Sequence, residues 1–150
     1  MSENTIFVRK YSVDASDSRF EINRKEVQRY AGYFRTDIPF DETIENLLNE
    51  VIEELQGKLA FKVCYRRMDL AWDSKTPQLP FECESKDLAK FLEGSSELIM
   101  FAATIGLDID RLIAKYQRLS PTKALLMQAL GAERVERLCD VFCDEIKEQA

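Results

Sequence analysis

The sequence has 150 residues, of which 45% are hydrophobic and 32% are charged, so it is long and apolar enough to bury the core of one globular domain. A net charge of -6 argues against a generally basic nucleic-acid-binding surface, and no apolar run approaches the ~20 residues that span a membrane. Histidine is absent, which excludes Ser–His and Cys–His catalytic pairs and His-containing zinc sites. The N-terminus lacks a signal-peptide pattern, so we expect a cytoplasmic protein.

The four cysteines show no metal-binding or redox spacing. Cys64 and Cys83 are scattered, while Cys139 and Cys143 are four residues apart, and no pair forms a Cys-x-x-Cys motif. Four thiolates can in principle bind zinc, but this spacing favours reduced structural thiols. We therefore expect no metal.

The N-terminal third predicts a strand followed by a capped helix. The segment Thr5–Val13 is rich in β-branched and aromatic residues, as is typical of a strand. Asn23 is a good N-cap with Glu26 three residues later, the pattern of a capping box, and it predicts a helix from Arg24 to about Phe34.

The clearest helical pattern in the chain follows Asp41, which marks the start. Between Glu42 and Gln56 the apolar residues recur with a 3.6-residue period, and Gly57 is a natural C-cap. These apolar positions are Ile44, Leu47, Leu48, Val51, Ile52 and Leu55.

The middle of the chain predicts a hairpin. Leu59–Leu70 alternates in part between apolar and polar residues and predicts a strand, and Asp73–Gln78 reads as a turn. Leu79–Cys83 predicts a second strand, with Pro80 placing it at an edge or at a strand start. We expect Leu59–Leu70 and Leu79–Cys83 to pair.

A short helix then leads into a buried strand. Ser85 is expected to cap a helix over Lys86–Leu92 that stops at Gly94. The apolar run from Glu97 to Ala103 predicts a core strand, and it leaves through Thr104-Ile105-Gly106. Such a glycine exit is either a tight structural turn or a place where backbone approaches a ligand.

The last third is predicted to be helical throughout. Asp108 is expected to cap a helix over Ile109–Leu119, and Pro121 suits the first turn of a second helix that ends at Leu130. Gly131 is expected to break that helix before a final one from Ala132 to Ala150. Strands and helices are mixed without a regular β-α-β alternation, which predicts one α+β domain with a mostly antiparallel twisted sheet and several packed helices.

Two groups of side chains are candidates for a binding site. Glu136, Asp140 and Asp144 share one face of the final helix, where they can hold an amino group or a cation or simply form a solvated face. Arg29 and Tyr30 can grip a carboxylate or a phosphate; alternatively, Tyr30 packs in the core and Arg29 is solvated. No nucleophile–base pair and no glycine-rich phosphate loop is present, so no catalytic residue is expected.

Three stretches carry a family resemblance: Glu26–Tyr33, Phe101–Gly106 and Ala129–Asp140. In their order and spacing they resemble the activation domain of vitamin B12-dependent methionine synthase, and above all its small standalone relatives. The resemblance implies an α+β domain that binds S-adenosylmethionine and docks onto a cobalamin-carrying domain of a corrinoid protein or methyltransferase. In that family, oxidised cobalamin is reduced by a flavodoxin-type partner and remethylated from S-adenosylmethionine, so the chain would not be an enzyme alone.

The resemblance also implies where S-adenosylmethionine would bind. Longer members continue past the final helix into an Arg-x-x-x-Gly-Tyr segment that contacts it, whereas this sequence ends at Ala150, so we expect a short member of the family. Glu136 and Asp140 are then expected to hold the ammonium or sulfonium group, with Thr104 and Gly106 nearby. Two alternatives stay open: a structural or regulatory partner-binding domain that has lost S-adenosylmethionine, and a small-molecule-binding domain independent of cobalamin.

Overall fold

A computed structural model describes residues 5–149, which form two compact units. The hairpin unit comprises residues 5–9 and Cys64–Ala102, and the helical unit comprises Lys10–Val63 and residues 103–149. The chain is α+β with antiparallel sheets, which confirms the predicted fold class.

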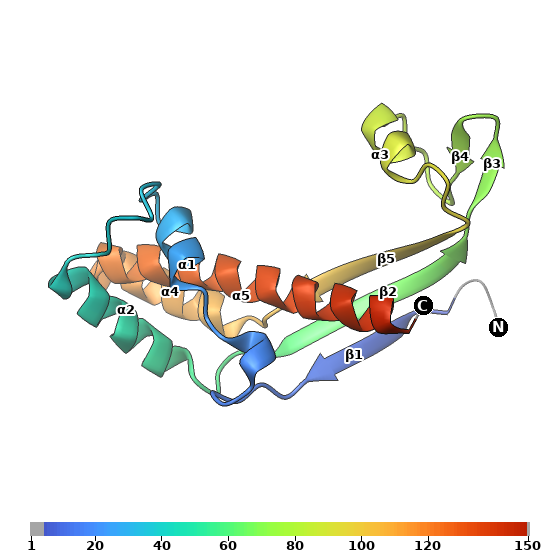
Figure 1. Cartoon of the computed structure of the whole chain (residues 1–150). Helices are drawn as coiled ribbons and strands as arrows, with labels where there is room; N and C mark the ends of the chain where they lie inside the picture. The colour runs from blue at the N-terminus through green and yellow to red at the C-terminus, as the bar shows by residue number, and fades with distance from the viewer. Residues whose placement is uncertain (1–4, 150) are drawn as a thin grey trace. The chain divides into compact units, whose positions relative to one another are not determined.

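Three strands run through both units. They are β1 (Phe7–Tyr11), β2 (Phe61–Asp69) and β5 (Glu97–Thr104), in the order β1-β2-β5. Figure 1 shows β2 antiparallel to both neighbours. The predicted strands at Thr5–Val13 and Glu97–Ala103 are therefore present, and both are edge strands of the sheet.

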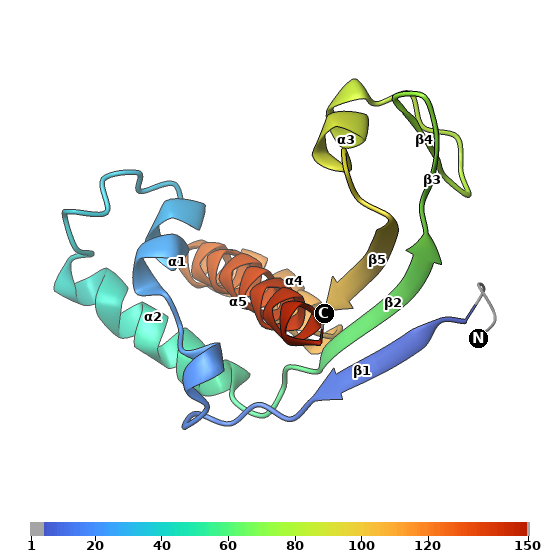
Figure 2. The same ribbon diagram turned by 45° about the vertical axis from the view of Figure 1, so that its right-hand side comes forward.

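One long helix organises the helical unit. Helix α5 (Pro121–Glu148) packs against α1 (Arg24–Tyr30), α2 (Glu42–Leu55), α4 (Asp108–Leu119) and the short 3-10 helix η1 (Ser18–Phe20) (Figure 2). Its apolar side chains meet those of α1 and α2. The most deeply buried side chains of the described residues all belong to this unit: Val27, Leu48, Val51, Val63, Leu126, Met127, Leu130, Leu138 and Phe142.

The predicted break at Gly131 is wrong, because α5 continues through it. A Cβ atom at Gly131 would lie 2.9 Å from Cδ1 of Ile109 on α4, which is closer than real Cβ contacts. The glycine is thus a contact residue that lets two helices approach. A glycine inside a helix costs ~1 kcal/mol relative to alanine, and here it lies where α4 and α5 pack together.

The predicted N-caps Asn23 and Ser85 are confirmed, and Asp41, predicted to mark the start of the second helix, is its N-cap. The side chain of Asn23 accepts a hydrogen bond from the backbone N–H of Glu26 at 3.2 Å, and Asp41 and Ser85 cap α2 and α3 in the same way. Asp108 differs from its prediction, because it is the first residue of α4 and no side chain caps that helix. Its carboxylate lies 3.4 Å from the guanidinium of Arg111 instead.

The hairpin unit contains a hairpin that starts earlier than predicted. Strand β3 (Ala71–Asp73) pairs with β4 (Thr76–Gln78) around a two-residue turn, where Ser74 has a φ of 59°. Leu79–Cys83, expected to be a strand, has no strand structure. Pro80 provides no backbone N–H for a ladder, and the local turn at Ser74 brings nearer residues together first.

Helix α3 (Lys86–Phe91) completes this unit, and Gly94 follows it with a φ of 80°. Backbone N–H of Leu70 donates to the carbonyl of Ser96 at 2.8 Å, which ties the end of β2 to the start of β5. The buried apolar side chains of the unit are few: Met68, Leu70 and Leu92.

Candidate binding surfaces

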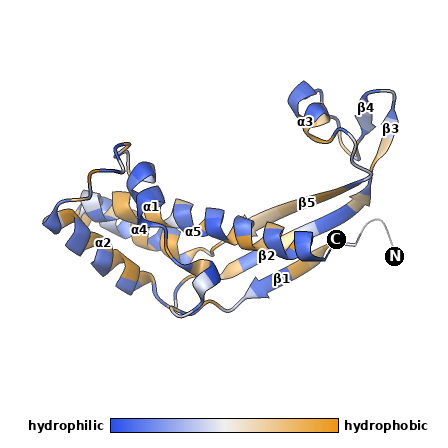
Figure 3. Ribbon diagram, viewed as in Figure 1, coloured by the Kyte–Doolittle hydropathy of each residue, from blue (hydrophilic) through white to orange (hydrophobic). Residues whose placement is uncertain are grey.

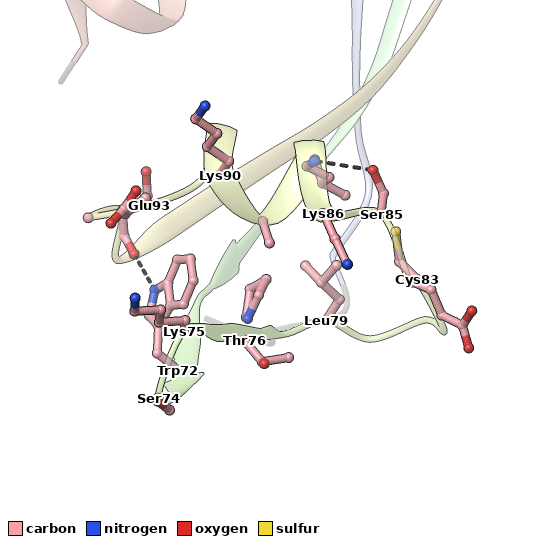
Figure 4. A pocket seen from close by; sticks show the side chains of 16 residues that line it. Trp72, Ser74, Lys75, Thr76, Leu79, Cys83, Ser85, Lys86, Lys90 and Glu93 are labelled. Atoms are coloured by element: carbon pink, nitrogen blue, oxygen red, sulfur yellow. Dashed lines mark hydrogen bonds between the residues drawn. The ribbon is translucent and has the colours of Figure 1, made fainter.

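The hairpin unit holds a pocket between the β3–β4 hairpin and the segment around α3 (Figure 4). Its volume is about 820 Å³. Pro77 and Leu79 line it from the hairpin side, and Leu88 and Ala89 line it from α3, so the walls include an apolar portion. The pocket exists because β3 and β4 turn back on themselves and α3 begins only eight residues after β4 ends. We call it the hairpin pocket.

Trp72, the single tryptophan of the chain, forms part of the pocket wall. Its indole Nε1–H donates to the carbonyl of Ser95 at 2.8 Å (Figure 4). Because the only polar group of the side chain is used, Trp72 offers its ring to the pocket as an apolar surface.

Three lysines line the same pocket, Lys75, Lys86 and Lys90, together with Glu84 and Glu93. Within the described residues, no carboxylate oxygen lies within 4.0 Å of any of these three ammonium groups. Figure 4 shows the ammonium group of Lys86 directed toward the hairpin, whereas Lys90 points away from it. The hairpin pocket therefore has an excess of unpaired positive charge, although the whole chain is acidic.

The strands of the hairpin unit also expose apolar side chains. Phe7 stacks on Tyr65 with ring centroids 5.3 Å apart, and Arg67 pairs with Glu97 at 2.7 Å. Because side chains alternate along a strand, these odd-numbered residues share one face. By the same alternation Val8 of β1, Met68 of β2, and Leu98 and Met100 of β5 are assigned to the opposite face, and Ile6 directly precedes β1; we call these five residues the aliphatic face.

The aliphatic face is only partly buried. The exposed fractions of Ile6, Val8 and Met100 are 63%, 58% and 43%, while Met68 on the central strand is buried. Figure 3 shows the hydrophobic character of β5 along its length. Edge strands with exposed apolar side chains are typical of surfaces that pair with or pack against another molecule.

The six site residues predicted from the sequence lie in the helical unit, and none of them lines the hairpin pocket. Arg29 and Tyr30 are neighbours on α1, with the guanidinium carbon 4.6 Å from the ring centroid. Arg29 also pairs with Glu26 at 2.7 Å, and this hydrogen bond lowers the pKa of the Glu26 carboxyl. The expected Arg–Tyr pair is thus present, but an internal carboxylate already occupies its guanidinium.

Thr104 and Gly106 form a structural turn. The Thr104 hydroxyl accepts a hydrogen bond from the backbone N–H of Gly106 at 3.1 Å, and Gly106 has a φ of 94°. A Cβ atom there would lie 3.1 Å from Cβ of Ala60. The carbonyl of Ile105 accepts from the N–H of Ala60 at 2.8 Å, so this glycine brings two backbone segments together.

Glu136 and Asp140 are exposed on α5, one helical turn apart. Between them lies Cys139, whose thiol pKa is raised chiefly by burial and further by the charge of Glu136. A thiol with a raised pKa stays protonated at neutral pH and is a poor nucleophile. The two carboxylates supply negative charge that suits a cationic ligand, but they do not line a described cavity.

The structure reveals a buried ion pair that the sequence analysis missed. Glu133 and Arg134 on α5 have exposed fractions of 3% and 5%, and two hydrogen bonds of 2.7 and 2.9 Å join them. Arg134 also donates to the carbonyl of Phe20 at 2.7 Å, and Glu133 accepts from the backbone N–H of Asn23 at 3.1 Å. The sequence signal was the position of Arg134, four residues from both Leu130 and Leu138 on the buried face of the helix.

Arg134 reaches a second cavity, of about 820 Å³, within the helical unit. The loop before η1, the end of α2 and Leu130 of α5 line it. Three of the five N–H groups of Arg134 have partners in the structure, all of them internal. The pair therefore ties η1 and α1 to α5, which is a structural role.

No protein-family model matches the chain, and no curated protein is significantly similar to it. Among residues 5–149, no cluster of three or more Cys, Asp or Glu side chains is placed to hold a metal ion. In the same part of the chain, no helix is both long and apolar enough to cross a membrane.

Proposed function

We propose that this chain is a cytoplasmic docking module of a cobalamin-dependent methyltransferase system. It binds a corrinoid-carrying protein through the aliphatic face of its β1-β2-β5 sheet. Two lines of support meet here: the resemblance of three sequence stretches to methionine synthase activation domains, and the exposure of Ile6, Val8 and Met100 on one face. The exposed face is the single structural observation on which the proposal depends.

The aliphatic face suits a protein partner because of its composition. Its exposed side chains come from two edge strands, and burial of each such side chain contributes roughly 1.5–3 kcal/mol. In this proposal the cobalamin supplies the methyl-transfer chemistry, and the chain supplies binding and orientation.

Binding to an isolated cobalamin-binding domain, measured by biolayer interferometry, tests the proposal. A Val8→Glu/Met100→Glu variant places two charges on the aliphatic face and is expected to weaken binding by at least about tenfold, because each buried charge costs more than one kcal/mol. Leu119→Glu is the control, since Leu119 is more exposed than Val8 and Met100 but lies at the end of α4 in the helical unit. Equal binding by both variants would contradict the proposed surface.

S-adenosylmethionine enters the proposal through Glu136 and Asp140. Their carboxylates would attract the ammonium or sulfonium group of the ligand. Calorimetry with S-adenosylmethionine on the wild type and on Glu136→Ala/Asp140→Ala checks this part. Heat in the wild type that disappears in the variant supports it, and no heat in the wild type rejects it.

A docking module without S-adenosylmethionine is the second candidate function. It is favoured by one observation: none of Glu136, Asp140, Thr104, Gly106, Arg29 and Tyr30 lines either described cavity. Partner binding with no S-adenosylmethionine heat would select this structural or regulatory role. S-adenosylmethionine heat without partner binding would instead select a cobalamin-independent small-molecule-binding domain.

A further inference from the structure

We propose that the hairpin pocket binds a small organic anion that carries a planar aromatic ring, such as a nucleoside monophosphate. This site lies wholly in the hairpin unit and uses none of the residues invoked for S-adenosylmethionine. It is also independent of the aliphatic face. The inference therefore stands or falls separately from the proposed function.

The apolar half of the pocket favours a flat ring. The hydrogen bond from Trp72 to Ser95 fixes the indole in place, and it leaves only the ring surface for a ligand. Leu79 lines the pocket after β4 (Figure 4), and Leu88 of α3 also belongs to the lining. An aromatic ring placed here gains stacking and apolar contact, and it needs no hydrogen bond from Trp72.

The polar half of the pocket favours an anion. Lys75, Lys86 and Lys90 belong to the lining together with Glu84 and Glu93, and of the three lysines Lys90 points away from the hairpin (Figure 4). Because no described carboxylate pairs with these ammonium groups, an incoming phosphate does not have to displace an internal partner. Lys86, whose ammonium group is directed toward the hairpin, is the best-placed cation for this contact (Figure 4).

Two hairpin residues with hydroxyl groups, Ser74 at the turn and Thr76 of β4, also belong to the lining. Thr76 pairs with Asp73, one position from the Trp72–Pro77 pair, so its side chain lies on the opposite face of the hairpin from the indole and is not counted as a ligand group. A volume of about 820 Å³ is in the range of pockets that enclose small ligands.

Trp72 makes the test direct, because it is the only tryptophan and its fluorescence reports this pocket alone. Adenosine monophosphate, adenosine and inorganic phosphate are titrated into the full-length protein, with calorimetry in parallel in case a bound ligand leaves the fluorescence unchanged. Adenosine monophosphate is expected to bind saturably, and at least about tenfold more tightly than either of the other two probes, because only it satisfies both halves of the pocket.

Two substitutions locate the binding. Lys86→Gln is expected to weaken adenosine monophosphate binding about tenfold, and Lys25→Gln on α1, outside the pocket, is expected to leave it unchanged. Raising the salt concentration is expected to weaken binding in the wild type more than in Lys86→Gln. Each substitution replaces an exposed side chain, so both proteins are expected to fold.

Three results would overturn the inference. The first is the absence of both calorimetric heat and a saturable fluorescence change with adenosine monophosphate. The second is equal affinity for adenosine monophosphate and adenosine, which would remove the role of the lysines. The third is an equal loss in Lys86→Gln and Lys25→Gln, which would indicate a general charge effect. S-adenosylmethionine titrated under the same conditions separates the two proposals, since its sulfonium charge is disfavoured by the lysines of this pocket.

Discussion

The two units of this chain differ in how they are held together. The helical unit wraps α1, α2 and α4 around α5, and it contains every described side chain that is almost completely buried. The hairpin unit buries only Met68, Leu70 and Leu92 among its apolar side chains. Each fully buried aliphatic side chain stabilises a fold by roughly 1.5–3 kcal/mol, so the helical unit has far more intrinsic stability.

This difference separates stability from binding. The helical unit uses its conspicuous polar groups internally, as Glu133 and Arg134 do across η1, α1 and α5. The hairpin unit leaves its lysines unpaired and its aliphatic face exposed. Regions with few buried contacts open locally at low free energy, and they gain most from a bound ligand or partner. The four predictions that follow test this contrast.

The largest effect is expected from truncating the core of the helical unit. Phe142→Ala should lower the free energy of unfolding by about 4 kcal/mol, because it leaves a cavity among fully buried neighbours. Leu92→Ala in the hairpin unit should cost about 2 kcal/mol and should raise amide hydrogen exchange mainly in residues 64–102. Urea unfolding with hydrogen-exchange mass spectrometry measures both. Similar exchange patterns in the two variants would contradict the contrast between the units.

The buried ion pair should be nearly as important to the helical unit. Arg134→Met leaves the carboxylate of Glu133 buried without its partner, so we expect a loss of about 3 kcal/mol in the free energy of unfolding. The double variant Glu133→Gln/Arg134→Met removes the unpaired charge and should recover at least half of that loss. Urea denaturation of the three proteins measures the difference. If the double variant were less stable than Arg134→Met, the unpaired carboxylate of Glu133 would not be the cause of the stability loss in Arg134→Met.

A smaller effect is expected from the turn at the end of β5. Gly106→Ala combines a left-handed backbone with a Cβ that would lie 3.1 Å from Ala60, so it should cost about 2 kcal/mol. Gly94→Ala in the hairpin unit has a similar φ but no atom within 4 Å of the added Cβ, and it should cost about 1 kcal/mol. Thermal unfolding measures both. The expected order fails if Gly94→Ala is the more destabilising of the two.

The smallest effect concerns a network that joins α2, α4 and α5. Glu54 accepts from the Tyr116 hydroxyl at 2.8 Å and lies 3.3 Å from the Lys123 ammonium. Burial raises the pKa of Glu54, but the hydrogen bonds from Tyr116 and Lys123 outweigh it and leave that pKa below its ordinary value of 4.5. The carboxylate therefore stabilises the fold above pH 4.5, and this contribution is lost as the pH falls through the lowered folded-state pKa.

Glu54→Gln should thus lower the stability by about 1 kcal/mol at pH 7 and by less in acid. Urea unfolding of wild type and variant at several pH values measures the gap between them. Glu136→Gln, an exposed carboxylate on α5, is the control and should leave the pH profile unchanged. If the stability difference between wild type and Glu54→Gln grew as the pH falls, the pKa of Glu54 would be raised rather than lowered in the folded protein.

Local sequence patterns predicted most helices because the relevant interactions lie within one turn. The N-caps at Asn23, Asp41 and Ser85 and the apolar period of α2 are of this kind. The prediction failed at Gly131, which lies inside α5 at a point where a Cβ atom would meet the side chain of Ile109 on α4. It also failed at Leu79–Cys83, because the hairpin closes at Ser74 instead.

The candidate sites divide in the same way. The pairing of Arg29 with Tyr30 follows from their positions on one helix, and the structure contains it. The hairpin pocket was not predicted from the sequence. Its lining combines Trp72, Lys86 and Ser95, which come together in one pocket only after β3, β4 and α3 have formed. The burial of Arg134 was signalled by its spacing from Leu130 and Leu138. Its partner Phe20, and Asn23, which is the partner of Glu133, are more than one hundred residues away in sequence.

The sequence by itself determined the α+β class, the cap residues of α1, α2 and α3 and the absence of histidine chemistry, because composition, periodicity and capping act over a few neighbouring residues. Only the tertiary structure decided that Gly131 is a helix contact, that Glu133 and Arg134 are buried together, and that Lys75 and Lys86 line the same pocket as Trp72. These features depend on contacts between distant segments, whose geometry is set by packing rather than by local propensity.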